Sequence, residues 1–262
     1  MSFCRVCGIV LIVVGVVSLA RADDILRALK GACRITASLE SHQLELKLER
    51  GQCAGNVDCN TRTFTEPADS FTGFSLSDLS RDGAHVDAVL RAEAGILTCT
   101  GSVHDSVLLG NFTFEPNNAF VARMGQLGIT GLDSEKLEAY TLFRIDSAWV
   151  QSLQKVGIQG IDANNLIAMK IFKAEPAYVE SLTALGYPTP SASKLIALRV
   201  HKVEPAEVKQ IRALGYEPTL DELVQMRIFK VTPSFIERMK ARGLNNLTIS
   251  KLVQIRIFKL DE

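Results

Sequence analysis

The sequence predicts an α+β protein of two modules. The first is a small, disulfide-linked antiparallel β-sandwich or barrel, and the second is an α-solenoid of five helix-turn-helix repeats. Three observations support this prediction. Apolar and polar residues alternate in the first module, which is typical of half-buried strands. Four of the six cysteines lie in the same module, and the other two, Cys4 and Cys7, lie in the N-terminal segment before it. In the second module a glycine recurs at a nearly constant spacing, which is the signature of stacked repeats.

Residues 1–22 have the pattern of a secretory signal peptide. Arg5 precedes an apolar run, and Ala20 and Ala22 place small residues before a cleavage point at Asp23. The run is shorter than the roughly 20 residues that a spanning helix needs, which disfavours a retained membrane anchor. We therefore expect an exported protein, periplasmic or secreted, with no membrane span after signal cleavage.

Charge divides the rest of the chain into the same two modules. Residues 23–115 carry 8 Lys and Arg against 14 Asp and Glu, a net charge of −6. Residues 116–262 carry 19 against 15, a net charge of +4. We therefore expect a β-rich module over residues 23–115 and the repeat array over residues 116–262.

The β-rich module shows five to seven short segments with the alternation of strands. The clearest lie around residues 33–39, 44–49, 86–90, 96–103 and 108–114, with a turn at 104–106. So many strands in so short a stretch predict a small sandwich or barrel.

The cysteines of this module predict two disulfides, because exported domains commonly contain an even number of paired cysteines. Four cysteines allow three pairings. Cys53 and Cys59 enclose a short Gly/Asn loop and pair easily by proximity, and Cys33–Cys99 would then join the first strand to a late one. A four-cysteine metal site is disfavoured, because no Cys-x2-Cys spacing is present.

No catalytic motif stands out in the chain. It contains no Gly-x-Ser-x-Gly, no His-Glu-x-x-His and no phosphate-binding glycine loop. His42, His85 and His104 are scattered and lie in or beside predicted turns. We expect no enzymatic activity, no cofactor and no metal. An unrecognised hydrolase stays open, because the members of a Ser/His/Asp triad need not be close in sequence.

The repeat array is defined by its glycines. These are Gly128, Gly157, Gly186, Gly215 and Gly243, at spacings of 29, 29, 29 and 28 residues. Each glycine is expected just after the end of a first helix, where φ is positive. Later copies of this helix are expected to begin at Asp146, Glu175, Glu204 and Thr232, three of them followed by proline. A second helix is expected to begin at Asp133, Asp162, Ser191, Thr219 and Thr248, residue types that cap helices.

Two basic columns recur near the end of the second helix. The first consists of Arg144, Lys173, Lys202, Lys230 and Lys259, and the second of Lys170, Arg199, Arg227 and Arg256, with Thr141 in the first copy. We expect the helix to end near the second column. The columns are either solvated stems that cover helix edges or a cationic row that grips an anionic partner. His201, in a column otherwise occupied by Phe, is expected to be a core or rim substitute.

The array resembles a set of uncharacterised bacterial secreted or periplasmic proteins. Their repeats read roughly Pro-x-Phe-Val-x-x-Leu-x-x-Leu-Gly-Tyr and then Leu-Thr-x-x-x-Leu-x-x-Leu-Arg. In this chain the pattern corresponds to Pro176–Tyr187 with Leu195–Arg199, and again to Pro205–Tyr216 with Leu223–Arg227. Similar arrays are attached to membrane metallopeptidases of the β-lactam-sensor type, whose zinc motif is absent here. The resemblance implies only an envelope sensing or binding role.

We therefore expect a non-enzymatic binding or scaffold protein of the cell envelope. Its partner would be a protein or an anionic envelope component, and self-association is possible through the acidic module and the apolar C-terminal end. Export disfavours nucleic acid as a partner. The alternative is a β-rich module that binds a carbohydrate or other small ligand, with the repeats as a spacer. The absence of Trp from that module disfavours sugar stacking.

Overall fold

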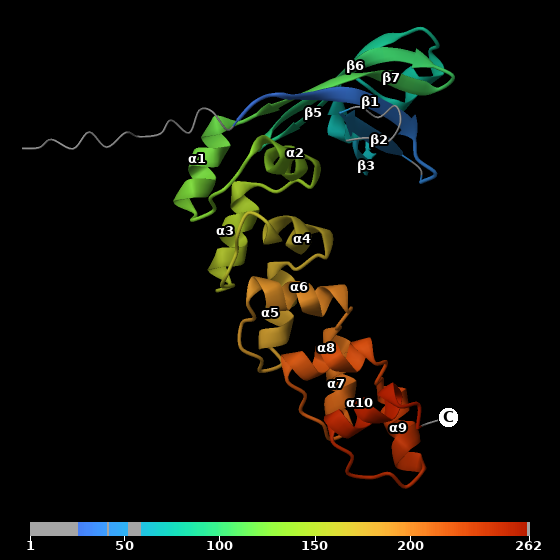
Figure 1. Ribbon diagram of the computed structural model, residues 1–262, viewed down its shortest axis with the longest axis vertical. Coiled ribbons are helices and arrows are strands. Elements are labelled where there is room, and N and C mark those ends of the chain that lie inside the picture. Colours follow the sequence, from blue (N-terminus) through green and yellow to red (C-terminus); the bar gives the residue numbers. More distant parts are fainter. Residues whose placement is uncertain (1–25, 41, 52–58, 261–262) are drawn as a thin grey trace, which may run out of the picture.

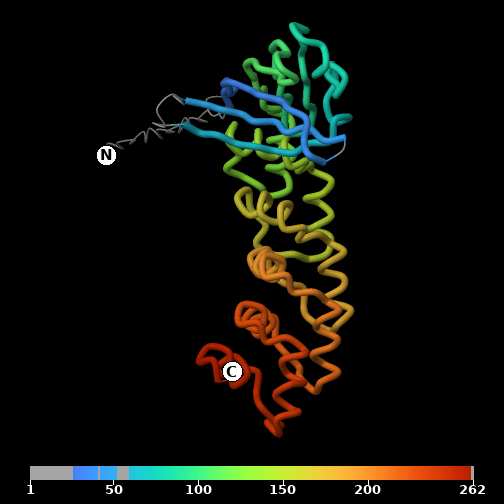
Figure 2. Tube along the Cα trace, turned by 90° about the vertical axis from the view of Figure 1, so that its right-hand side faces the viewer, coloured from blue at the N-terminus to red at the C-terminus, as the bar shows by residue number. Residues whose placement is uncertain are grey.

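The computed structural model describes residues 26–40, 42–51 and 59–260. The predicted signal peptide and Cys53 lie outside the described residues. Two parts follow one another in space, a curled sheet at one end and an elongated stack of helices that leads away from it (Figures 1 and 2). The strands are β1 Leu29–Ala37, β2 Gln43–Arg50, β3 Asn60–Pro67, β4 Phe71–Thr72, β5 His85–Ala92, β6 Gly95–His104 and β7 Val107–Pro116.

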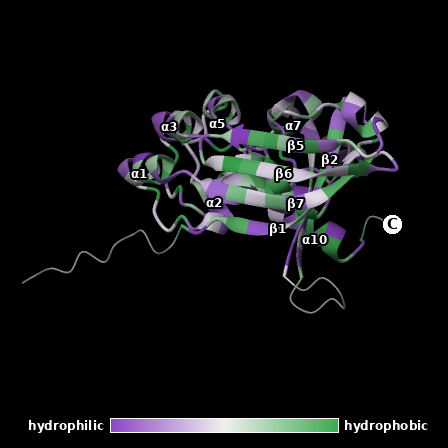
Figure 3. Ribbon diagram, turned by 90° about the horizontal axis from the view of Figure 1, so that it is seen from above, coloured by the Kyte–Doolittle hydropathy of each residue, from purple (hydrophilic) through white to green (hydrophobic). Residues whose placement is uncertain are grey.

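The strands form a single antiparallel sheet in the order β3-β2-β1-β7-β6-β5-β4. The sandwich alternative is therefore wrong, because a sandwich needs two sheets. The sheet curls as a half-barrel, with β3 and β4 at its two edges. Figure 3 shows hydrophilic and hydrophobic residues alternating along β5, β6, β7 and β1. The inward set includes Leu44, Leu46, Leu97 and Leu108, all 0% exposed, so the concave face is the core.

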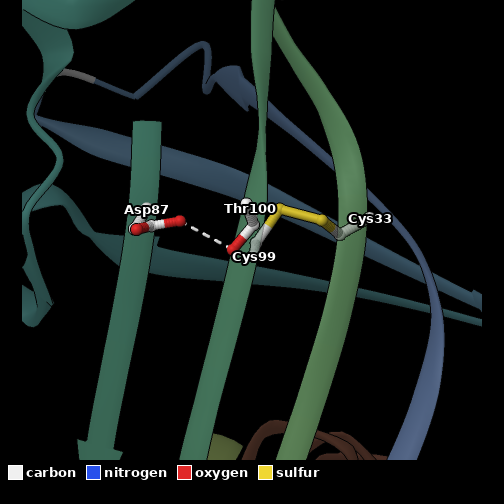
Figure 4. The surroundings of a disulfide bond; sticks show 4 residues. All are labelled: Cys33, Asp87, Cys99 and Thr100. Carbon is white, nitrogen blue, oxygen red and sulfur yellow. Dashed lines mark hydrogen bonds between the residues drawn. A yellow bond between two sulfur atoms is a disulfide. The ribbon is translucent and has the colours of Figure 1, made fainter. Parts of the chain in front are cut away.

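A disulfide holds the curl at the centre of the sheet. Cys33 of β1 and Cys99 of β6 flank β7, and the bond between them brings their Cα atoms to 6.0 Å (Figure 4). In a flat sheet, strands on either side of a common neighbour stand about 9–10 Å apart. The predicted Cys33–Cys99 pairing is confirmed. The Cys53–Cys59 pairing stays a prediction, because Cys53 is not among the described residues.

Two glycines make this close approach possible. Gly101 of β6 lies directly opposite Gly110 of β7. A Cβ built on Gly110 would lie 2.0 Å from the carbonyl oxygen of Thr100, and one on Gly101 would lie 2.1 Å from that of Leu109. Side chains at these positions would force the strands apart, so glycine allows the bend over which the disulfide closes.

The second part contains helices that alternate in position along the stack. Figure 1 shows α1, α3 and α5 on one side and α2, α4 and α6 on the other. Even helices pack on the next even helix from α4 to α10, and among the odd helices α1 packs on α3 and α7 packs on α9. The bounds are α1 Asn118–Gln126, α2 Ser134–Leu142, α3 Ser147–Lys155, α4 Asn165–Ile171, α5 Pro176–Thr183, α6 Ala192–Val200, α7 Pro205–Ala213, α8 Leu220–Ile228, α9 Pro233–Ala241 and α10 Ile249–Ile257.

The helix ends agree closely with the sequence prediction. The N-caps of α2, α3, α5, α6, α7, α8, α9 and α10 are the predicted residues, and Thr219 also forms a capping box with Glu222. The exception is α4, which begins after Asn164 rather than after Asp162. Asp162 Oδ1 accepts the N–H groups of Asn164 and Asn165 at 2.7 and 2.8 Å, so it forms a turn that delays the regular helix. The five repeat glycines have φ between 78° and 85°, as expected.

The first helix pair is docked against the sheet. β7 ends at Pro116 and α1 begins at Asn118, so the chain changes from strands to helices between these two residues. However, α2 packs on β5, β6 and β7, and the buried apolar residues of sheet and helices form one continuous cluster. The β-rich module therefore covers the end of the helical stack.

A carboxylate in the β5–β6 turn fastens this junction. Glu93 accepts the backbone N–H of Ser147 at 2.7 Å, at the first residue of α3, and also bonds to Arg123 of α1 at 2.8 Å. Burial opposes ionisation and is the largest effect, but the donors on Ser147 and Arg123 together outweigh it and lower the pKa of Glu93. The ionised carboxylate also complements the positive end of the α3 dipole.

Candidate functional site

The first basic column lies at one equivalent point of every helix pair, one residue beyond the end-cap residue of the even helix. Arg144, Lys173, Lys202, Lys230 and Lys259 have φ values of 54°, 55°, 54°, 55° and 51°. The following N–H returns to the last turn, as from Val203 to the carbonyl of Leu198 at 2.9 Å. This is a Schellman ending, with the basic residue at its left-handed position. The helix thus ends beside the second column, as predicted.

A basic residue in the left-handed conformation has two opposing effects on the stability of the folded state. The left-handed region costs a residue with a side chain about 1–2 kcal/mol. A positive charge beside the last carbonyls of a helix contributes about 0.3–1 kcal/mol. The odd helices use glycine at the corresponding position and avoid the cost. Glycine would end the even helices equally well, so folding alone does not explain the lysines.

The lysines of this column point to solvent. Lys173, Lys202, Lys230 and Lys259 are exposed. In the part of the chain that the structure describes, no carboxylate lies within ion-pair distance of these four lysines. Their charges are therefore available to a partner.

The second basic column is engaged inside the protein instead. Three of its members cover an aromatic ring on the odd helix of the same pair. Lys170 Nζ lies 4.5 Å from the centroid of Trp149, and the guanidinium carbons of Arg199 and Arg256 lie 4.8 and 5.2 Å from those of Tyr178 and Phe235. Cation–π contacts of this kind are worth about 0.5–1 kcal/mol at exposed sites.

The arginines of this column also join successive helix pairs. The Nε atoms of Arg199, Arg227 and Arg256 donate to the carbonyls of Phe172, His201 and Phe229 at 3.0, 3.1 and 3.2 Å. Each acceptor is the end-cap carbonyl of the preceding even helix, which has no partner within its own helix. This geometry gives the second column a structural role. The first column therefore remains as the candidate for partner binding.

Glu207 replaces the aromatic residue in the fourth helix pair. Arg227 then meets a carboxylate instead of a ring, with Nη1 at 2.9 and 3.1 Å from the two oxygens of Glu207. The cation is retained and its partner changes from a ring to an anion. The signal for this pairing lies in the sequence itself, because Glu207 is the one acidic residue in a column that is otherwise aromatic.

Exposed apolar residues precede each lysine of the first column. Ile171, Val200, Ile228 and Ile257 are 48%, 40%, 47% and 47% exposed, and Phe258 is 68% exposed. We call residues 171–173, 200–202, 228–230 and 257–259 the tripeptide row. The arginine bonds between successive helix ends place these tripeptides next to one another along the stack. His201, which was expected to be a core or rim substitute, is partly buried at the row.

The equivalent tripeptide of the first helix pair is covered by the sheet. Leu142 is only 3% exposed. The ring of Phe143 meets that of Phe64 edge-on, with centroids 5.6 Å apart. Arg144 Nη2 lies 3.6 Å from the carboxylate of Glu66, and burial raises the pKa of Glu66 although Arg144 acts in the opposite direction. Phe64 and Glu66 both belong to the edge strand β3.

A second contact of β3 lies one helical turn away. Arg62 Nη1 donates to Glu138 of α2 at 3.0 Å. Glu138 is 1% exposed, and burial raises its pKa despite the nearby charges of Arg50 and Arg62. Alternate residues of β3 thus contact α2 and the turn after it, and they are in order basic (Arg62), aromatic (Phe64) and acidic (Glu66).

The β-rich module offers less for chemistry. His85 Nδ1 and Ser102 Oγ are 3.4 Å apart on the exposed outer face of β5 and β6, and no described carboxylate orients the imidazole. A depression of about 350 Å³ on the sheet is lined by Arg34, Lys47 and Glu49 among others and contains no aromatic side chain. Among the described residues, no three His, Cys, Asp or Glu side chains are grouped to hold a metal ion.

Comparisons of the chain with protein-family models, with curated proteins and with solved structures find no match. Across residues 26–40, 42–51 and 59–260, no helix has both the length and the apolar character to cross a membrane.

Proposed function

We propose that this protein is an exported, non-enzymatic binding protein whose helices form a five-repeat α-solenoid. In this proposal the β-rich module covers one end of the solenoid, and the tripeptide row binds a partner in the periplasm or outside the cell. The disulfide, which is typical of exported proteins, supports this location. The resemblance to bacterial envelope proteins suggests the same setting.

The exposure of the tripeptide row is the observation that carries the proposal. Four successive helix ends each present an apolar side chain that is 40–48% exposed, beside an exposed lysine. The fifth, at Leu142, is buried under the sheet. The same apolar position is therefore buried in the first helix pair and exposed in each of the four pairs that follow it along the stack. Aligned apolar surface of this kind marks an interaction site.

Site-specific photocrosslinking in the producing cell tests this function. A photoreactive amino acid is placed at Phe172 or at Phe229 on the row, and at Glu180 on α5 as the matched exposed control. We expect adducts of defined mass from the two row positions and none from the control. Adducts at twice the mass of the chain would identify self-association through the row. Equal labelling of all three positions, or no adduct from the row, would contradict the proposal.

A further inference from the structure

We infer that each exposed unit of the tripeptide row binds an extended polypeptide segment with an apolar, an aromatic and an acidic side chain at alternate positions. This inference rests on the proposed function and names the chemistry of its partner. The contact between β3 and the first helix pair provides the template, because β3 already occupies the equivalent surface there.

The template assigns two of the three side chains directly. Phe64 of β3 packs edge-on against Phe143, and Glu66, two residues further along the strand, lies 3.6 Å from Arg144. Alternate residues of a strand lie on one face, about 6–7 Å apart. The row repeats the receiving side, with Phe or His in the place of Phe143 and Lys in the place of Arg144.

The third side chain must differ from the template. Arg62 of β3 meets Glu138 on α2. The position equivalent to Glu138 is occupied in the later pairs by Ile167, Ile196, Val224 and Val253. Each lies four residues before the exposed Ile or Val of its helix, so the two share one face. An arginine would be desolvated there without a partner, whereas an apolar side chain would extend the contact. The preferred segment therefore reads apolar-x-aromatic-x-acidic.

The exposed apolar residues of the tripeptide row disfavour a polyanion without apolar groups as the partner. Lysine alone would suit a sulfated or carboxylated polysaccharide. Such a chain would leave Ile171 and Ile228 uncovered, and these are 48% and 47% exposed. A peptide carries both kinds of group and can satisfy the apolar face and the lysine together. An extended segment can also lie across one helix end, as β3 does across the end of α2.

A peptide taken from this chain is the direct probe. Its sequence is that of residues 61–67 with leucine in place of Arg62, that is Thr-Leu-Thr-Phe-Thr-Glu-Pro. Binding to the full mature chain is followed by amide chemical shifts in NMR, which give both the affinity and the location. We expect shifts along the tripeptide row. Retaining the arginine should weaken binding, and alanine in place of the phenylalanine should weaken it at least about tenfold.

Glycine variants of the protein test the lysines without a risk to folding, because glycine favours the left-handed conformation. Lys173→Gly, Lys202→Gly and Lys230→Gly together should weaken binding at those sites about two- to fivefold, the effect of an exposed ion pair. The charge control is Lys155→Ala, Lys209→Ala and Lys251→Ala, three exposed lysines outside the row, and it should bind as the parent does.

The outcomes separate the inference from the proposed function. If photocrosslinks form at Phe172 while the peptide produces no shifts along the row, the peptide chemistry is wrong and the binding function stands. Saturable binding of dextran sulfate to the row, unaffected by the peptide, would assign the surface to a polyanion and overturn the inference. Peptide binding that ignores both the phenylalanine and the three lysines would overturn it as well.

Discussion

Replacing Cys33 and Cys99 together by alanine should destabilise the whole protein, including the helices far from the sheet. The bridge joins β1 to β6 across β7 and lies in the buried concave face, with its cysteines 4% and 0% exposed. The same face packs on α2, the first even helix of the stack. Loosening the sheet therefore also loosens the cover of the helical stack.

The size of the effect follows from the loop that the bridge closes. The cysteines are separated by 66 residues. The loss of chain entropy in the unfolded state then corresponds to about 4 kcal/mol at 25 °C. One kcal/mol shifts the melting temperature of a chain of this size by about 2–4 °C, so the variant should melt about 10–15 °C lower.

Two probes distinguish a global effect from a local one. Far-UV circular dichroism follows the whole chain, and the fluorescence of Trp149, the single tryptophan, reports on α3. We expect both transitions to move down together. Alanine at both Cys53 and Cys59 is the comparison, since the short loop predicted there is worth only about 2 kcal/mol. A shift below about 3 °C for the Cys33/Cys99 variant, or an unchanged Trp149 transition, would refute the argument.

Three further predictions concern the junction and the stack. Glu93→Gln should lower the free energy of unfolding by about 1–2 kcal/mol at pH 7, because it removes charge-assisted bonds to Ser147. Since folding lowers the pKa of Glu93, this contribution is present above the unfolded pKa and is lost as pH falls through the folded pKa. Urea titrations of the parent and the variant should therefore show a difference in the free energy of unfolding at pH 7 that vanishes in acid. A difference that stays constant with pH would contradict the prediction. Glu207→Tyr should change the free energy of unfolding by less than about 0.5 kcal/mol, because Arg227 can stack on a ring as its equivalents do. Glu207→Ala should lower it by about 1 kcal/mol. Equal losses of stability for the two variants in thermal denaturation would argue against this exchange of partners. The fragment 118–262 uncovers α2 and should melt at a lower temperature than the helices of the whole protein, and an identical melting temperature would show that the sheet contributes no stability to them.

The sequence alone determined the local features of this protein. Helix starts such as Asp146 and Thr219 followed from residue types that accept backbone N–H groups close in the chain. Helix ends such as Gly157 followed from a positive φ that glycine tolerates. The Cys33–Cys99 pairing was accessible because four cysteines allow few combinations. All of these depend on interactions within a few residues or on a short list of alternatives.

The tertiary structure decided which surfaces are covered. Nothing in the alternation of polar and apolar residues distinguishes two sheets from one curled sheet, because both bury one face of each strand. The curl depends on the contact between Gly101 and Gly110, which are brought together only by the pairing of β6 with β7. Glu93 was missed for the same reason, since its partner Ser147 is 54 residues away.

The two basic columns differ for a reason that no spacing shows. Arg199 and its equivalents reach carbonyls of the preceding helix pair, and this reach depends on how the helices stack. Lys173 and its equivalents stand where the chain turns left-handed, which directs them to solvent. Both columns have the same charge and the same period in sequence, so only the packing of one helix pair on the next separates the structural cations from those available to a partner.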